Sequence, residues 1–293
     1  MKKITKKITA LILALMLLCS SVCHADNISD SRTVIGADLD SNEIASVYKS
    51  FGIERGDVKE LTVTNADERK YLEGQVDESL IGTRSISCIY IEAQGSGEGL
   101  DVSVDNITWC TADMYMNAMV TAGITDANVK IVAPYKVSGT AALTGIYMAY
   151  EDITGKKLDE DAKLVGTKEL TITAELADEI GSADSTAIVN ELKLILDQTK
   201  DMTDDELREQ IKQIAEKYEV TLNDSQIDQL ISLCRSLEKL DVSALKEKVE
   251  QVQQYIKNIA DTKGSVEKFL SEAADTVTEF VNKVIDFFKN LFG

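Results

Sequence analysis

The sequence predicts an α+β protein in which an N-terminal mixed-sheet α+β domain is followed by a C-terminal all-helical region. Up to residue 181, short β-type runs alternate with short helical patterns. After that position nearly every segment has helical periodicity, and only one proline interrupts the whole chain. The predicted layout is therefore a leader over 1–25, an α+β domain over 26–181 and a helical domain over 182–293.

The first 25 residues have the order of a cleavable secretory signal peptide. Four lysines precede an apolar run over 8–18, and Cys23 and Ala25 place small residues at the expected cleavage site before Asp26. The apolar run is shorter than the roughly 20 residues that span a bilayer. We expect a secreted or envelope-associated extracytoplasmic protein, with no stable membrane span after cleavage.

Cleavage at this point changes which kinds of chemistry the chain supports. Without the four leader lysines, 27 basic residues face 50 acidic ones, and the net charge moves from −19 to −23. Such a chain repels nucleic acid. His24, the only histidine, leaves with the leader, so the mature chain lacks Ser-His-Asp and Cys-His mechanisms and imidazole metal ligands. We expect no catalytic, cofactor-binding or metal-binding residues, and no cofactor.

The α+β part predicts five strands and four helices. The strands are expected at 33–37, 58–63, 85–94, 100–109 and 128–133, and the helices at 41–51, 66–72, 112–122 and 139–152. Glycine-rich residues 95–99 predict a hairpin between the third and fourth strands, and Pro134 is expected to end the fifth. This order favours helices on one face of a mixed sheet.

Two helix–strand segments resemble one another at an offset of 71 residues. Gly52-Ile53 precedes Val58-Lys59, and Gly123-Ile124 precedes Val129-Lys130. Each glycine is expected to end its helix in the left-handed conformation. The similarity suggests an internal duplication, although convergence on a common connection explains it equally well.

The helical region ends in a long amphipathic pattern. Capping signals at Thr203 and Asn223 predict two helices, and a heptad spacing of apolar residues runs over 242–259 and resumes over 266–291. Gly264 either breaks this pattern into a helix pair or lies within one long helix. A candidate interaction surface covers the last turns, at Phe280, Val284, Phe287, Phe288, Leu291 and Phe292. Packing within the helical domain, a partner or homo-oligomer contact, and a membrane interface are the three interpretations.

One candidate ligand loop lies between the fifth strand and the helix that follows it. Ser138, Gly139 and Thr140 place hydroxyl groups and a glycine at a helix N-terminus, where free backbone N–H groups attract an anion. Helix capping and close packing are the alternative interpretation. The acidic run from Asp38 to Asn42 has the first spacings of a calcium loop but lacks its glycine and final glutamate, so it predicts a helix cap.

Three cysteines remain in the mature chain. Cys88 and Cys110 fall on neighbouring predicted strands, so the sequence leaves open whether they are bonded. Cys234 lies on the apolar face of a predicted helix and is expected to be a small buried side chain.

Several segments resemble the YpuA-like exported proteins of Gram-positive bacteria. In chain order they are Arg32–Leu39, Gly56–Val58 with Thr62–Arg69, Gly82–Ser87, Asn106–Trp109 and Ser138–Gly145. The resemblance covers nearly the whole mature chain. It implies export and a two-part layout, and because the family carries a domain of unknown function, it implies no catalytic or cofactor residues.

These observations favour a non-catalytic extracytoplasmic interaction or scaffold protein of the cell envelope. Its partner is expected to be an unidentified protein or envelope component, with homo-oligomerisation through the C-terminal helices as one form of assembly. Two alternatives remain open at this point. The first is an envelope hydrolase that relies on carboxylates instead of histidine, and the second is a binder of small anionic ligands at Ser138–Thr140.

Overall fold

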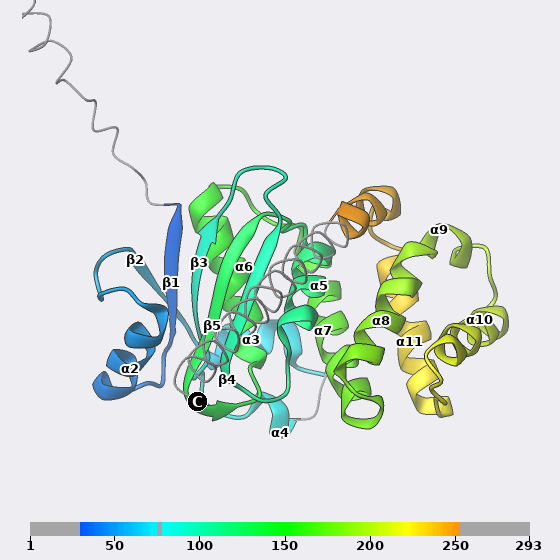
Figure 1. Cartoon of the computed structure of the whole chain (residues 1–293), viewed down its shortest axis with the longest axis horizontal. Coiled ribbons are helices and arrows are strands. Elements are labelled where there is room, and N and C mark those ends of the chain that lie inside the picture. Colours follow the sequence, from blue (N-terminus) through cyan, green and yellow to red (C-terminus); the bar gives the residue numbers. More distant parts are fainter. Residues whose placement is uncertain (1–29, 75–77, 252–293) are drawn as a thin grey trace, which may run out of the picture.

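A computed structural model describes residues 30–74 and 78–251 (Figure 1). The predicted leader, Gly264 and the candidate surface from Phe280 to Phe292 lie outside these residues. None of the helices described there is long and apolar enough to cross a membrane.

A mixed five-stranded sheet forms the N-terminal half, as the sequence predicted. Its strands are β1 (Ser31–Gly36), β2 (Lys59–Val63), β3 (Cys88–Ala93), β4 (Leu100–Ile107) and β5 (Ala127–Val137). In space they follow the order β2-β1-β3-β5-β4. β1 is parallel to β2 and β4 is parallel to β5, whereas β3 is antiparallel to both of its neighbours.

The predicted hairpin between β3 and β4 was wrong, because β5 lies between these strands. Ala127 of β5 pairs with Ala93 on one side and with Leu100 on the other. The glycine-rich loop is attached to the start of β5, since the backbone N–H groups of Gly97 and Gly99 donate to the Asp126 carboxylate at 2.7 and 2.9 Å. The loop therefore spans an inserted strand instead of making a tight turn.

β5 also continues past Pro134, where the sequence predicted its end. The pairing with β4 shifts between Asp105 and Ile107, which lie opposite Val132 and Val137. The proline falls in the stretch that this shift leaves out of the ladder, so its missing N–H group costs no strand hydrogen bond. Asn106 adopts a φ of 60° at the irregularity and donates a side-chain hydrogen bond to the Ala133 carbonyl.

Five helices of the described residues belong to the sheet part, and the sequence predicted all of them except the short one over 78–81. They are α2 (Ser41–Phe51), α3 (Asn65–Leu72), α4 (Glu78–Ile81), α5 (Ala112–Ala122) and α6 (Thr140–Thr154). Asp40 and Glu43 form a capping box at the start of α2, which confirms the helix-cap interpretation of this acidic run. Gly52 and Gly123 end α2 and α5 with φ values of 77° and 96°.

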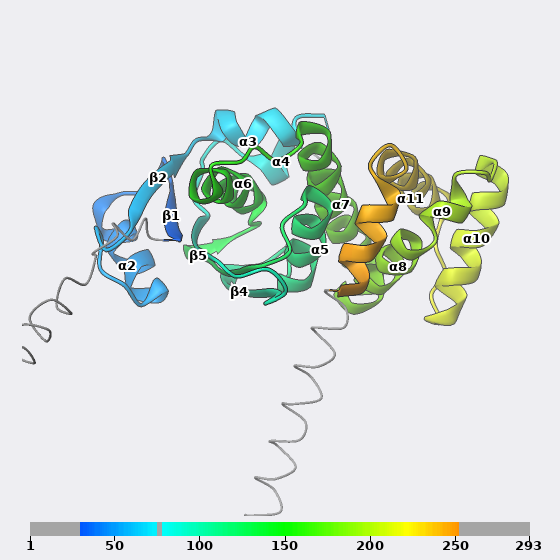
Figure 2. The same cartoon turned by 90° about the horizontal axis from the view of Figure 1, so that it is seen from above.

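These helices lie on both faces of the sheet, so the expected single-face arrangement was wrong (Figure 2). α2 packs with Ile35 and Cys88 on one face, whereas the adjacent Val34 and Ile89 face α5 and α6 on the other. Because side chains alternate along a strand, each strand serves both layers.

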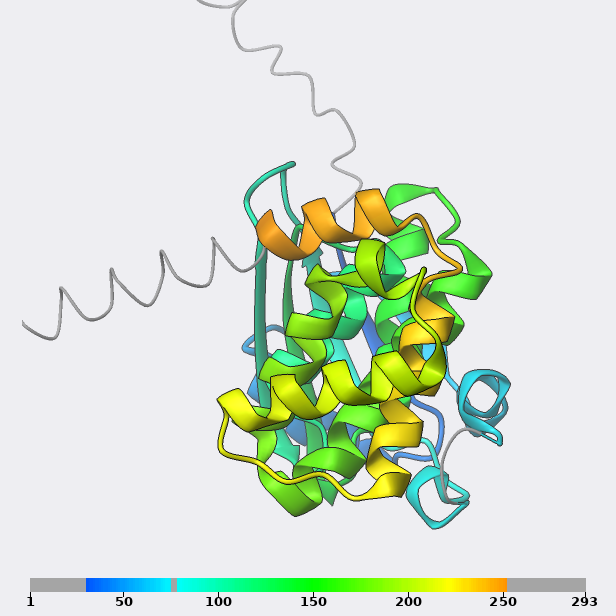
Figure 3. The ribbon, with the colours of Figure 1, turned by 90° about the vertical axis from the view of Figure 1, so that its right-hand side faces the viewer.

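Helices make up the C-terminal half, and they cover one end of the sheet part (Figure 3). They are α7 (Glu160–Ile180), α8 (Ser182–Leu194), α9 (Leu196–Thr199), α10 (Asp204–Lys217), α11 (Asp224–Leu237) and a further helix over 242–251. Thr203 and Asn223 cap α10 and α11 as predicted. The buried side chains of Val242, Leu245 and Val249 begin the heptad pattern, which then leaves the described residues.

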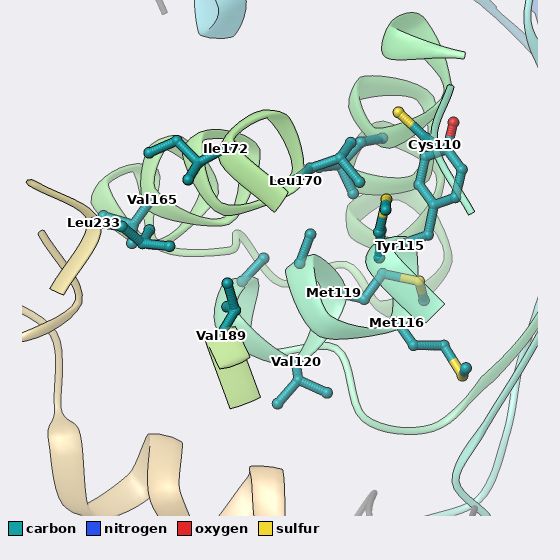
Figure 4. Close-up of a cluster of buried hydrophobic side chains, with 14 of the residues drawn as sticks. Cys110, Tyr115, Met116, Met119, Val120, Val165, Leu170, Ile172, Val189 and Leu233 are labelled. Carbon is teal, nitrogen blue, oxygen red and sulfur yellow. The ribbon is translucent and has the colours of Figure 1, made fainter. Parts of the chain in front are cut away.

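One continuous apolar core joins the two halves. It extends from the sheet through α5 and α7 to α8, α11 and the 242–251 helix. Figure 4 shows part of this core, to which α5 contributes Met119, α7 contributes Leu170 and α8 contributes Val189. α7 is therefore packed on two sides and connects the sheet to the outer helices.

A fully buried ion pair lies at the junction of α5, α7 and α8. The Lys193 ammonium is 2.8 Å from a Glu169 carboxylate oxygen, and neither side chain is exposed to solvent. Lys193 also donates to the Asn117 carbonyl at 3.1 Å, and the Thr121 hydroxyl donates to the second Glu169 oxygen. Every charged group of this junction thus has a partner from a different helix.

The three cysteines of the described residues are free thiols in the core. Cys88 belongs to the cluster under α2, whereas Cys110 and Cys234 belong to the main core on the opposite face. This placement answers the question that the sequence left open for Cys88 and Cys110, and it confirms that Cys234 is buried. Burial raises the pKa of each thiol to about 12.

We expect these three thiols to resist alkylation in the native protein at pH 8. Only the thiolate reacts, and a pKa of about 12 leaves very little of it at that pH. Peptide mass analysis after iodoacetamide treatment should find Cys88, Cys110 and Cys234 labelled only when denaturant is present. Denatured, unreduced protein in which Cys88 and Cys110 stay unlabelled would contradict the free-thiol assignment.

Candidate functional site

Four helix starts meet at one edge of the sheet. β1, β2, β4 and β5 run in the same direction, and each leads into a helix: α2, α3, α5 and α6 respectively. The carboxyl ends of parallel strands are the usual place for ligands in open sheets that contain helices. The candidate loop Ser138–Thr140 lies at this edge, between β5 and α6.

A cavity of about 240 Å³ opens beside this loop. Its walls are Glu68 on α3, the segment over 79–84 with residues 86 and 87, and residues 137, 138, 140 and 141. We call it the Glu68 cavity. Glu68 is the one carboxylate among its described lining residues, and only 1 % of this residue is exposed.

The Glu68 carboxyl group is held by neutral partners. The Thr140 hydroxyl donates to one oxygen at 2.6 Å, and the Asn65 amide lies 3.5 Å from the other. Burial raises the pKa of Glu68 to about 7, although the two hydrogen bonds and the nearby charge of Arg69 oppose this shift. The group therefore changes its charge near neutral pH, inside a cavity that reaches solvent.

Ser138 and Thr140 line the cavity, as the ligand-loop interpretation requires, but their hydroxyl protons are already used. Ser138 donates to the Leu80 carbonyl at 3.1 Å, and Thr140 donates to Glu68. An anion placed here would meet a carboxyl group next to Thr140. The geometry therefore favours a ligand that offers Glu68 a hydrogen-bond donor over one that binds only through the helix N-terminus.

Gly139 has a packing role at this site. It precedes α6 with a φ of 100°, and its carbonyl accepts the Tyr115 hydroxyl at 2.6 Å. A β-carbon at Gly139 would lie 2.5 Å from both the Tyr115 oxygen and a methyl group of Ile107. Only glycine fits this conformation and this approach.

Arg84 is an exposed residue of the cavity lining. Its guanidinium group donates to the Asp38 carbonyl at 2.6 Å and to the Tyr135 hydroxyl at 3.1 Å. Tyr135 is 40 % exposed, so an aromatic ring lies in solvent next to this guanidinium group. Arg84 and Glu68 are thus two lining residues of opposite charge around one small cavity.

Sequence reasoning missed both Glu68 and Arg84. Glu68 shares the buried face of α3 with Tyr71 and Leu72, at the i, i+3, i+4 spacing of an apolar face. A carboxylate at such a position was the available signal. Arg84 lies in a segment without regular structure and carried no comparable signal.

We expect Glu68 to lower the stability of the protein as pH rises from 5 to 8. Its pKa is about 7 in the folded state and about 4.3 when unfolded, so the folded protein holds the extra proton between these values. Replacing Glu68 with glutamine removes this loss. The stability of Glu68→Gln relative to the wild type should therefore increase by about 2 to 3 kcal/mol between pH 5 and pH 8, measured by urea unfolding.

Glu60 is the matched control, because its environment has the opposite effect. Hydrogen bonds from Arg55 and Tyr48 lower its pKa although burial opposes them, so its charged form stabilises the fold. Glu60→Gln should cost stability at neutral pH, and this cost should shrink on acidification. A pH profile of Glu68→Gln that is parallel to the wild type would contradict the raised pKa.

The described residues contain no group of three or more metal-ligating side chains. The paired-carboxylate chemistry of glycoside hydrolysis also lacks its second carboxylate among the described lining residues of the Glu68 cavity.

Comparison with known proteins gives one family and one curated relative. The family model for "Protein of unknown function (DUF1002)" matches residues 35–279. The chain is 34 % identical to "Uncharacterized protein YpuA" of Bacillus subtilis (strain 168) over 269 residues, which cover 91 % of this chain and 88 % of that protein. No solved structure matches the chain.

Proposed function

We propose a function for this chain, a member of the DUF1002 family of proteins of unknown function, from its own cavity. We infer that it is an exported, non-catalytic recognition protein that binds a small polar ligand in the Glu68 cavity. The observation that carries this proposal is Glu68 itself, because a carboxyl group with 1 % exposure and only neutral hydrogen-bond partners is costly to bury. Retaining it beside a cavity is typical of a binding site.

The family resemblance supports the same place in the fold. Three of the five resembling segments, Thr62–Arg69, Gly82–Ser87 and Ser138–Gly145, supply walls of the cavity. The other two contact these three segments: the Asp38 carbonyl accepts a hydrogen bond from Arg84, and Ile107 lies against Gly139.

A screen of small polar molecules by thermal unfolding tests the proposal. Ligands of the cavity should raise the melting temperature of the wild type and lose this effect in Glu68→Gln. Glu175→Gln is the matched control, because Glu175 is a half-buried carboxyl group outside the cavity that also accepts a side-chain hydrogen bond, from Gln229 at 2.6 Å. A broad screen without any ligand, or ligands that bind Glu68→Gln equally well, would contradict the proposal.

Export is a separate part of the proposal. We expect the mature protein to begin at Asp26, which N-terminal sequencing of protein from culture medium and envelope fractions measures.

We further propose that the C-terminal segment docks to an envelope partner or to a second copy of the chain. Deletion of residues 265–293 should then change the oligomeric state in light scattering or abolish capture of the partner.

Histidine-independent hydrolysis is the second candidate function. It is favoured by the pKa of about 7 for Glu68, which suits a general acid or base, and by the Thr140 hydroxyl at 2.6 Å. Turnover of an envelope polymer by the wild type and by Glu175→Gln, but not by Glu68→Gln, would replace the binding proposal with this one.

A further inference from the structure

Arg84 differs from every other arginine in the described residues because its guanidinium group has no carboxylate within ion-pair distance. Each of the other five lies within ion-pair distance of a carboxylate. Their pairs are Arg32–Asp152, Arg55–Glu60, Arg69–Glu78, Arg208–Asp228 and Arg235–Asp204. Arg84 is held instead by a backbone carbonyl and a tyrosine hydroxyl, both of them neutral.

These two neutral contacts orient the guanidinium group without cancelling its charge. A guanidinium group has five N–H donors, and the contacts to Asp38 and Tyr135 use two of them. The remaining donors suit a carboxylate, which arginine binds in a two-pronged arrangement. In a chain with a net charge of −19, a guanidinium group without a carboxylate partner in the described residues points to an anionic group on a ligand.

Glu68, in contrast, requires a hydrogen-bond donor with a positive charge. Thr140 supplies a donor to one carboxyl oxygen at 2.6 Å, whereas the other oxygen has only the Asn65 amide at 3.5 Å. An ammonium group on a ligand would supply both the missing donor and the compensating charge. The cavity, whose lining includes both residues, measures about 240 Å³, roughly the liquid volume of eight water molecules. Such a space suits a molecule the size of an amino acid.

We propose that the Glu68 cavity binds a small zwitterion of the amino-acid type, with its carboxylate on Arg84 and its ammonium group on Glu68. This inference rests on the proposed ligand-binding function and adds the chemical class of the ligand. The exposed Tyr135 hydroxyl would share the Arg84 guanidinium group with the ligand carboxylate.

Binding should depend on pH in a direction that identifies the ammonium contact. The titratable and charged groups around Glu68 are Arg69 on its own helix, Tyr115 on α5 and Arg84 on the cavity wall. Burial raises the pKa of Tyr115 well above its ordinary value, so this hydroxyl does not titrate in the tested range. Glu68 loses its proton as pH rises from 6 to 8, so the affinity for an ammonium ligand should rise over this range. A purely anionic ligand would show the opposite trend.

Calorimetric titration of the full mature protein with glycine, L-alanine, D-alanine and L-glutamate tests this assignment. Propionate, which lacks the ammonium group, and ethylamine, which lacks the carboxylate, serve as probes of each half. At least one amino acid should bind, and each single-charge probe should bind at least about tenfold more weakly. Arg84→Gln should weaken amino-acid binding at least about tenfold, while Arg84→Lys should restore part of the affinity.

Two control variants separate this assignment from general effects of charge. Arg208→Gln removes a surface arginine that pairs with Asp228, and Glu175→Gln removes a carboxylate outside the cavity. Both should bind the amino acid with wild-type affinity. Propionate that binds as tightly as alanine, or amino-acid binding that survives Arg84→Gln, would overturn the zwitterion assignment. If amino acids fail while another small molecule binds in a manner that depends on Glu68, the zwitterion inference is wrong and the proposed function stands.

Discussion

Lys193→Met is expected to lower the free energy of unfolding by about 3 to 5 kcal/mol. The substitution keeps the apolar stem but removes the ammonium group, so the Glu169 carboxylate stays at zero exposure with the Thr121 hydroxyl as its remaining partner. An uncompensated buried charge accounts for a cost of this size. Equilibrium unfolding in urea measures it, with far-ultraviolet circular dichroism to check that the helices persist.

The double variant Glu169→Met, Lys193→Met is the control for this interpretation. It removes both charges and fills the junction with apolar side chains, although the Thr121 hydroxyl and the Asn117 carbonyl then lose partners. It should be more stable than Lys193→Met by more than about 1 kcal/mol, because no isolated charge remains. If the loss of stability in the double variant equals the sum of the losses in the two single variants, the two groups do not act as a pair.

Gly139→Ala is expected to cost about 2 to 5 kcal/mol of stability. Two effects add at this position: a φ of 100°, which strains any side chain, and a β-carbon 2.5 Å from both Ile107 and the Tyr115 hydroxyl. If the strain is relieved by movement of the start of α6, Thr140 is displaced from Glu68. The measurement is urea unfolding together with the binding assay for the Glu68 cavity.

Gly155→Ala separates the two effects at Gly139. Gly155 has a φ of 65°, and an added β-carbon would meet nothing within 4 Å. It therefore carries only the conformational cost, about 1 to 2 kcal/mol. Equal destabilisation by the two alanine variants would show that the close approach at Gly139 contributes nothing.

The sequence predicted those parts of the fold that depend on local signals. The glycines that end α2 and α5 and the capping residues of α2, α10 and α11 act within a few residues of themselves, and each lies where it was predicted. The partners of β3 and β4 were wrong because strand pairing is decided at long range. Nothing within 88–107 signals that β5 will insert between these two strands.

Sequence reasoning also missed α7, for a different reason. Its buried face includes Thr167, Glu169, Thr171 and Thr173, all of them polar. Buried threonines satisfy their hydroxyl groups on carbonyls of their own helix, as Thr167 and Thr173 do with the residues four positions earlier. Such a face lacks the apolar 3.6-residue period on which a helix prediction relies.

The sequence predicted the loop residues of the candidate site but not its two charged residues. Ser138 and Thr140 stood out because hydroxyl groups flank a glycine at a helix start. Glu68 lies 72 positions before its partner Thr140, so only the folded chain reveals the pair. The same limit applies to Arg84, whose contacts to Asp38 and Tyr135 span 46 and 51 residues.

The continuous core has a consequence for how the chain reaches its native state. Val242, Leu245 and Val249 complete a cluster that begins with Val34, so almost the whole described chain must be present before this core closes. During synthesis from the N-terminus, the sheet part and α7 leave the ribosome first. The apolar side of α7 that packs against the later helices would stay exposed until the last of these helices has been synthesised. A truncated protein that ends at Gly181 should accordingly aggregate on expression, and the full chain should melt in a single calorimetric transition.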